Sequence, residues 1–160
     1  MHLSSQEEYG LRCLIQVARA AGPDPLTIHE IAAAEGLSPE YAAKLMRCLR
    51  QNELVTSTRG AAGGYRLARP AAEISAWEVL QALGGRVFSE GFCDTHPGQR
   101  DSCVHTTDCS IRPLWRAVEG TLARLLGAIH LADLCGEEGE MRSAIQRSEE
   151  HRERHLPLVL

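Results

Sequence analysis

The sequence predicts a mainly α-helical fold with one small β-hairpin, and three observations support this. Apolar residues recur at helical spacing along most of the 160 residues. Residues suited to helix N-caps precede several of these stretches. One short region instead alternates apolar and polar residues on either side of a glycine-rich turn. A hydrophobic content of 44% and a charged content of 24% are typical of a globular domain of ordinary size.

The first half of the chain predicts three helices and then the hairpin. A helix over residues 4–22 begins with serines suited to an N-cap, and Thr27 caps a second helix that Gly36 ends. Ser38, followed by proline, begins a third helix with the sequence "EYAAKLMRCLRQNE". Two short helices joined by a glycine-containing turn form a helix-turn-helix. The segments "LVTST" and "YRLAR" then alternate around "RGAAGG", and a hairpin in this position is a wing.

The second half predicts two more helices, separated by a polar loop. A short amphipathic helix covers residues 75–85, and a long helix covers residues 110–134 with Ser110 as its N-cap. We expect the long apolar face of the second helix to pack against the same helix of another subunit, the alternative being an internal core helix. This face is formed by Ile111, Leu114, Trp115, Val118, Leu122, Leu125, Leu126 and Ile129.

The net charge of −4 conceals a basic segment. Residues 41–69 contain Lys44, Arg47, Arg50, Arg59, Arg66 and Arg69 against the single acid Glu53, a local charge of 6 − 1 = +5. Such a segment is expected where a protein docks on phosphates, and a solvated helix face is the alternative.

A winged helix-turn-helix in a dimer places its recognition helix in a major groove and its wing beside the adjacent minor groove. Side chains on the first turns of the recognition helix reach base edges, and later basic residues meet phosphates. An arginine beside a glycine-rich tip suits a narrow minor groove. The candidate DNA contacts are Glu40, Tyr41, Ala43 and Lys44 at base edges, Arg47 and Arg50 at phosphates, and Arg59 in the wing. The alternative role for Glu40 is stabilisation of the helix dipole.

The polar loop contains the stretch "CDTHPGQRDSCVHTTDC" over residues 93–109. Three of the six cysteines of the chain lie in it, whereas Cys13 and Cys48 fall in apolar helical patterns typical of core residues. In a reducing cytosol, clustered cysteines more often bind metal or sense redox state than form disulfides. The residues alone favour zinc bound by Cys93, Cys103, Cys109 and His105, and they leave open a bare thiol sensor.

Three segments together resemble a known family. They are "EYGLR" near the start, "LSPEYAAKLMRCLRQNELVTSTRGAAGGYRLARP", and a cysteine loop preceding "PLWRAVEGTLARLLGAIHLADL". Over residues 1–134 the chain resembles the dimeric winged-helix iron–sulfur transcriptional regulators typified by IscR, NsrR, RirA and RsrR. The resemblance implies a homodimeric transcription factor whose affinity for a palindromic operator is set by an iron–sulfur cluster. It also implies a response to cluster supply, iron, nitric oxide or redox state.

The same resemblance implies which residues hold the cluster. Cys93, Cys103 and Cys109 match the three cluster cysteines, although the first two lie further apart than is usual in the family. The histidine ligand of the IscR type is replaced by Arg112, and a guanidinium is not an ordinary iron ligand. The carboxylate ligand of the NsrR and RsrR types corresponds to Glu8, which we expect to reach the cluster of the partner subunit.

Two histidines of the loop are alternatives for the fourth ligand, His105 first and His96 second. The carboxylate analogy favours a [4Fe-4S] cluster over a [2Fe-2S] cluster. Zinc and thiol chemistry remain the rival interpretations of the loop.

These observations divide the chain into four predicted regions. Residues 1–85 form a winged helix-turn-helix DNA-binding domain, residues 86–109 a cysteine-rich cluster-binding loop, and residues 110–135 a dimerisation helix. Residues 136–160 form a charged C-terminal tail that we expect to be mobile or loosely helical.

An enzyme, for instance an iron–sulfur redox protein, is the alternative from another functional class. The sequence has no nucleotide-binding glycine loop and no nucleophile–base pair, and "RGAAGG" precedes a strand rather than a helix. A regulator without enzymatic activity is therefore expected. We find no secretory signal and no apolar run long enough for a membrane span, so the expected location is the cytoplasm, without a membrane partner.

Overall fold

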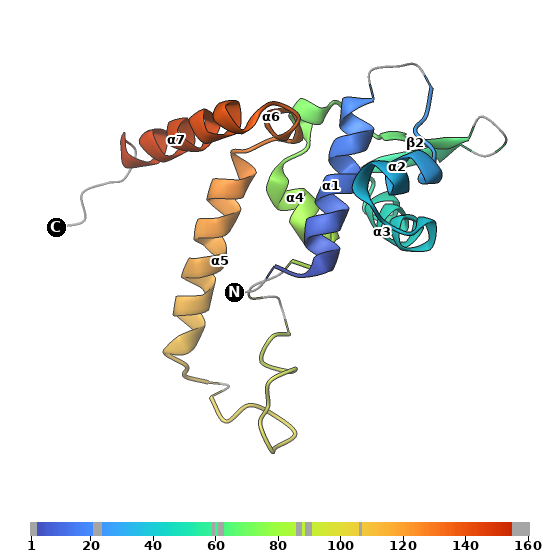
Figure 1. Ribbon diagram of the computed structural model, residues 1–160. Coiled ribbons are helices and arrows are strands. Elements are labelled where there is room, and N and C mark those ends of the chain that lie inside the picture. Colours follow the sequence, from blue (N-terminus) through green and yellow to red (C-terminus); the bar gives the residue numbers. More distant parts are fainter. Residues whose placement is uncertain are drawn as a thin grey trace.

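The computed structural model describes residues 3–20, 24–58, 60, 63–85, 88, 91–105 and 107–154, with side chains as far as residue 147. Helices α1 to α4 and the hairpin form one packed body, and α5 with the loop before it extends from that body (Figure 1). The order of elements is α1 (Ser5–Arg19), α2 (Ile28–Glu35), α3 (Pro39–Gln51), β1 (Val55–Thr58), β2 (Gly64–Leu67), the 3₁₀ helix η1 (Ala71–Glu73), α4 (Ala76–Ala82), α5 (Ile111–Gly127), α6 (Leu131–Leu134) and α7 (Glu138–Arg154).

Capping residues fix the starts of the first four α-helices, as the sequence predicts. Ser4 caps α1 and Thr27 caps α2, and in each case a glutamate three residues later completes a capping box. The Ser38 hydroxyl accepts a hydrogen bond from the Tyr41 amide at the start of α3. Ser75 caps α4 through another capping box. Local chemistry therefore determines where these helices begin.

The hydrophobic core brings α1, α2, α3 and α4 together. Each helix turns one apolar face inward because its apolar residues recur at helical spacing. Burial of each leucine or isoleucine side chain contributes roughly 1.5–3 kcal/mol. The core side chains with no exposed surface are Cys13, Leu14, Ile31, Ala42, Leu45, Met46, Leu49, Ile74, Val79 and Leu131.

The helix-turn-helix and the wing form as predicted. Gly36 ends α2 with a φ of +65°, a left-handed conformation that lets the chain turn into α3. Strands β1 and β2 pair antiparallel, with Val55 opposite Leu67. Leu26 extends this small sheet through two backbone hydrogen bonds to Tyr65, with N–O distances of 3.0 and 2.8 Å. The mainly helical fold with a hairpin wing is confirmed.

Helix α5 is shorter than the predicted helix over residues 110–134. It ends at Gly127, and Ser110 makes no side-chain capping bond. Ile129, which the sequence placed on the apolar stripe of the same helix, is only 4% exposed and lies in the core. Its carbonyl accepts a hydrogen bond from the Ala76 amide (2.8 Å), and the Leu131 amide donates to the Ile74 carbonyl (2.8 Å). These bonds hold the chain extended between α5 and α6, which ends the helix.

The apolar face of α5 is exposed over its first turns in the single chain, and its later apolar residues are half-buried. No residue of α5 is buried, and Ile111, Leu114 and Trp115 are 53%, 57% and 39% exposed. Exposure of several large apolar side chains on one helix face is typical of a surface that meets another protein.

The C-terminal region, which the sequence predicts to be mobile or loosely helical, contains a helix. Helix α7 runs from Glu138 to Arg154 and extends away from the body on the side opposite the wing (Figure 1). Within the part of the chain that the structure describes, no helix is both long and apolar enough to cross a membrane.

Candidate functional site

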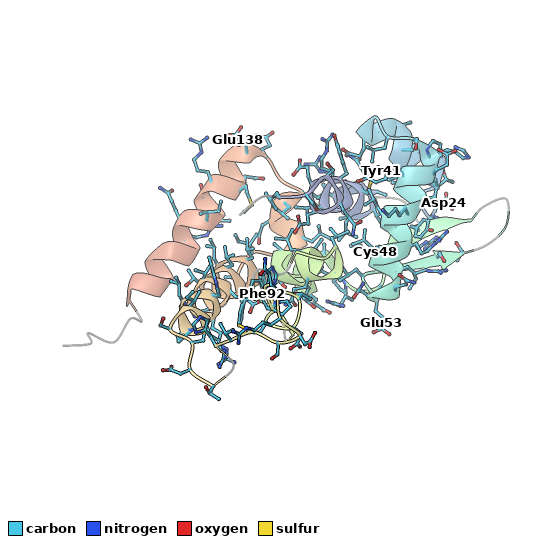
Figure 2. The ribbon with its side chains drawn as sticks, turned by 90° about the horizontal axis from the view of Figure 1, so that it is seen from below. Asp24, Tyr41, Cys48, Glu53, Phe92 and Glu138 are labelled. Atoms are coloured by element: carbon cyan, nitrogen blue, oxygen red, sulfur yellow. The ribbon has the colours of Figure 1, made fainter. Side chains whose placement is uncertain are left out.

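Helix α3 presents a polar face on the surface of the helix-turn-helix. Its apolar face is fixed in the core by Ala42, Leu45, Met46 and Leu49. Of the predicted DNA contacts on this helix, Tyr41 and Ala43 are half-buried, and Glu40, Lys44, Arg47 and Arg50 are exposed. Figure 2 shows Tyr41 toward one end of α3 and Cys48 further along the same helix.

Two of these side chains have local partners. Hydrogen bonds from the backbone amide of Glu40 itself and from the Ser38 hydroxyl lower the pKa of the Glu40 carboxyl. This contact agrees with the alternative role of Glu40 at the helix N-terminus. Arg50 Nη1 donates to Ser57 Oγ of β1 at 3.3 Å, which links the helix to the wing. Arg59 lies outside the described residues.

The three loop cysteines border one cavity of about 200 Å³ between the loop and the first turns of α5. The loop side of this cavity also contains both candidate histidines, His96 and His105. The remaining lining residues are Phe88, Phe92, Ile111, Arg112 and Trp115. The sulfur and imidazole donors that the sequence singled out therefore line one cavity, whereas the Glu8 carboxylate does not.

Within the described residues of one chain, these donors do not form a closed metal site. Among the described residues, no three histidine, cysteine, aspartate or glutamate side chains lie close enough together to hold a metal ion. All six cysteines are free thiols, and the three in the cavity are half-buried. Three thiols and two imidazoles around one cavity are nevertheless a donor set that suits a cluster or zinc.

The cysteines outside the loop have different surroundings. Cys13 is fully buried, and burial raises the pKa of its thiol to about 11. Cys48 is half-buried, and its Sγ donates to the Ala82 carbonyl at 2.9 Å. Burial also raises the pKa of the Cys135 thiol. These contacts are those of structural cysteines, as the sequence predicted for the first two.

Aromatic side chains also line the cavity, and the sequence did not predict them. The Phe88 and Phe92 rings lie 5.0 Å apart, and Phe92 stacks on His96 at 4.1 Å with an interplanar angle of 15°. Figure 2 shows Phe92 in the loop next to α5. The only sequence signal for this stack is the four-residue spacing of Phe88, Phe92 and His96, which places side chains on one side of a helical turn.

Glu8 is exposed on α1 and does not line the cavity of its own chain. Its neighbours on α1 are fixed to the helix-turn-helix. The Tyr9 ring meets Tyr41 of α3 edge-on, with centroids 6.2 Å apart. Arg12 Nε donates to Glu35 Oε2 of α2 at 2.6 Å. Within one chain the Glu8 carboxylate is therefore not one of the groups at the cavity.

The known proteins to which this chain is similar are transcriptional regulators. The family model described as Rrf2, iron-dependent transcriptional regulator, matches residues 3–137. The chain is 35% identical over 136 residues to the HTH-type transcriptional regulator Rv1287 of Mycobacterium tuberculosis, covering 85% of this chain and 82% of the relative. It is 30% identical over 156 residues to IscR of Sodalis glossinidius, covering 98% of this chain and 91% of that protein.

Two solved structures share the fold. CymR (YrzC), the global cysteine regulator of B. subtilis, superposes with a TM-score of 0.64 at 28% identity, covering 84% of this chain and 96% of that chain. IscR of T. potens gives a TM-score of 0.63 at 29% identity, covering 84% of this chain and 85% of that chain. On the match over residues 3–137 and the likeness to these regulators, the chain belongs to the Rrf2 family of transcriptional regulators.

Proposed function

We propose that this regulator is a cytoplasmic homodimer whose affinity for a palindromic DNA operator is controlled by an iron–sulfur cluster. The observation that carries the proposal is the position of Cys93, Cys103 and Cys109 around one cavity, directly before the helix with the open apolar face. The likeness to proteins named IscR and the description of the family as iron-dependent support it. The protein acts by binding DNA rather than by catalysing a reaction.

The DNA-binding surface is the polar face of α3 together with the wing. The base-edge contacts are Glu40, Tyr41, Ala43 and Lys44, the phosphate contacts are Arg47 and Arg50, and the minor-groove contact is Arg59. The exposure of the charged residues on α3, and the burial of its opposite face, support this assignment. A dimer presents two such helices to two half-sites.

The dimer forms through α5. A helix of 17 residues spans about 26 Å at a rise of 1.5 Å per residue. In the single chain it has no buried residue and exposes Ile111, Leu114 and Trp115. Pairing with the same helix of a second chain removes this apolar surface from water.

The cluster is held by the three cysteines of one chain and by Glu8 of the partner subunit. Within one chain the thiols border the cavity while the carboxylate lies outside it, which is consistent with a ligand from the second chain. When bound, the cluster would supply one iron that lacks a thiolate ligand. That iron would respond to oxidants, to nitric oxide or to iron limitation. The residues that would hold the cluster are the three cavity cysteines of one chain and Glu8 of the other, and Phe88, Phe92 and Trp115 line the same cavity.

A binding experiment tests the regulatory part of the proposal. Purified protein, prepared anaerobically with and without cluster, is titrated against a pool of short duplexes to select an operator, and affinity is then measured against salt. We expect tight binding to a palindrome, a steep salt dependence because several phosphates are contacted, and a difference between the two forms. Weak and equal binding to every duplex, with or without cluster, would contradict the proposal.

A metal analysis tests the cofactor. Anaerobically purified protein should contain iron and sulfide in equal amounts and absorb visible light, and Cys109→Ala should lose both. A normal spectrum in Cys109→Ala would refute the assignment of that ligand. One zinc per chain without visible absorption would replace the cluster by the zinc site of Cys93, Cys103, Cys109 and His105.

Mixed dimers test the ligand from the second chain. A Glu8→Ala chain is combined with a Cys103→Ala chain. Ligation across the interface leaves one site of the mixed dimer intact and the other without both groups. Ligation within a chain damages both sites, so that no wild-type spectrum survives.

Thiol sensing is the second candidate function, and one observation favours it. The three cavity cysteines are free, half-buried thiols, and the chain is similar in fold and sequence to CymR, described as a global cysteine regulator. In this case two loop cysteines form a disulfide on oxidation and DNA affinity changes without any metal. Peptide mapping of metal-free protein before and after a mild oxidant, with operator binding measured on both samples, separates this function from cluster control.

A further inference from the structure

The ring of His96 has the hydrogen bonding of a metal-binding histidine. Its Nδ1 lies 2.8 Å from the carbonyl oxygen of Phe92. A carbonyl oxygen only accepts hydrogen bonds, so the neutral ring carries its proton on Nδ1. The Thr95 hydroxyl, 3.0 Å from the same nitrogen, lies 2.9 Å from the Phe92 carbonyl and donates to it. The free lone pair of the ring is therefore on Nε2, as in histidines that bind metal while the other nitrogen donates to a carbonyl.

The position of the ring is also fixed. His96 stacks on Phe92, which in turn contacts Phe88. The backbone amide of His96 donates to the carbonyl of Cys93 at 3.3 Å, so these two residues belong to one turn of the loop. Both line the cavity that contains the other two loop cysteines. A ring held in this way loses little conformational freedom when it binds a ligand.

The other histidine of the cavity lacks this arrangement. The backbone carbonyl of His105 accepts a hydrogen bond from Arg112 Nη2 at 3.1 Å. Within the described part of the chain, the ring of His105 makes no hydrogen bond that would fix its tautomer. We therefore rank His96 above His105 as a candidate donor.

We propose that His96 is a second donor for the cluster position that Glu8 of the partner subunit fills, so that the fourth ligand can come from either chain. This inference rests on the proposed function. Two observations support it. The His96 imidazole at the cavity has its free lone pair on Nε2, and Glu8 does not line the cavity of its own chain.

The exchange of these two ligands is balanced without any redox step. In such an exchange His96 Nε2 would donate its lone pair in place of the Glu8 carboxylate oxygen, no electron would be transferred, and the proton on Nδ1 would stay hydrogen-bonded to the Phe92 carbonyl. The charge of the site becomes more positive by one because a neutral imidazole replaces an anion. The exchange would release α1 of one chain from the loop of the other. Tyr9, next to Glu8 on α1, contacts Tyr41 of the recognition helix.

Four full-length variants test this proposal, namely Glu8→Ala, His96→Ala, the double variant, and His105→Ala as the matched control from the same loop. Each is reconstituted anaerobically with ferrous iron and sulfide, and circular dichroism checks folding. Iron and sulfide are measured per chain, and pulsed EPR on protein grown with isotope-labelled histidine detects a nitrogen ligand. All three replaced side chains are exposed, so the variants are expected to fold.

We expect Glu8→Ala to retain its cluster and to gain histidine nitrogen coupling, and His96→Ala to retain the wild-type spectrum. The double variant should bind iron at least about tenfold more weakly than either single variant, because both donors are gone. His105→Ala should match the wild type.

Three results would overturn the inference. They are a Glu8→Ala chain without iron, a Glu8→Ala chain with cluster but no histidine coupling, and a double variant that keeps its cluster. A wild-type protein without iron and sulfide is a different failure, because it removes the cluster itself and with it the proposed function.

Discussion

The contact of α1 with α4 leaves no room for a side chain at Gly10. A β-carbon at this position would lie 2.4 Å from Cδ2 and 2.7 Å from Cδ1 of Leu83. Leu83 follows the last residue of α4 and is only 2% exposed, so its methyl groups cannot move into solvent without leaving the core. We therefore predict that Gly10→Ala forces Leu83 out of its rotamer or separates the two helices.

The expected change in stability follows from two opposing effects. Adding a methyl group to a packed contact costs about 1–3 kcal/mol. Alanine in a helix interior is more favourable than glycine by about 0.8–1 kcal/mol. Gly10→Ala should therefore lower the free energy of unfolding by about 0–2 kcal/mol, and Leu83→Ala alone should lower it by about 2–5 kcal/mol. In the double variant the new methyl group enters the space that the leucine leaves, so only the helix-propensity gain of Gly10→Ala remains.

The assay is urea unfolding followed by circular dichroism at one protein concentration, because dimerisation links stability to concentration. Gly10→Ala should be destabilising in the wild-type chain and neutral or stabilising in the Leu83→Ala chain, a coupling of about 1–3 kcal/mol. If the two substitutions add within about 0.5 kcal/mol, the close contact of these residues is not as the structure describes it.

Three other predictions follow from named side chains. Because Cys13 is fully buried with a thiol pKa of about 11, iodoacetamide at neutral pH should label the loop cysteines of the folded, metal-free protein well before Cys13, and rapid labelling of Cys13 in peptide mass spectra would contradict this. Hydrogen bonds from Ser75 lower the pKa of Glu78 in the folded state, so Glu78→Gln should be less stable than the wild type at neutral pH, and urea titrations should show the gap closing as the pH falls through that lowered pKa. Arg47→Ala should reduce the slope of operator affinity against salt by about one, whereas Arg147→Ala on α7 should leave the slope unchanged.

The helix-turn-helix could be predicted from the sequence because the signals that define it are local. Thr27 and Ser38 cap the next turn of backbone, and Gly36 supplies the left-handed conformation between them. The wing was predictable for a similar reason, since alternating residues on either side of a glycine-rich turn favour a hairpin whatever surrounds it. At these positions tertiary packing agrees with local preference.

The end of α5 could not be predicted because a distant segment determines it. Ile129 continues the helical spacing of Leu125 and Leu126, and no proline interrupts the pattern. The chain leaves the helix because Ile129 and Leu131 form backbone hydrogen bonds to Ala76 and Ile74. Such pairing across more than fifty residues of sequence has no local signature.

The sequence predicted the cysteines and histidines that line the cavity. It did not predict the aromatic rings beside them or which ring nitrogen of His96 carries the proton. Cysteines recur visibly in the loop, and the resemblance to known regulators predicts that three of them are ligands. The stack of Phe88, Phe92 and His96, however, depends on a turn of irregular backbone that has no repeating pattern. The proton on His96 Nδ1 depends on a single carbonyl of that turn.

Hydrogen bonds at the end of α4, just before the cysteine loop, connect this part of the chain to the recognition helix α3. The last carbonyls of a helix have no partner within the helix and must find one elsewhere. Here the Ala82 carbonyl accepts from the Cys48 thiol of α3 at 2.9 Å, and the Leu83 carbonyl accepts from Gln6 Nε2 of α1 at 2.8 Å. Side chains from α3 and α1 thus satisfy two consecutive carbonyls immediately before the loop. Under the proposed function, a movement that starts in the loop would therefore reach the recognition helix and the helix that carries Glu8 at the same place.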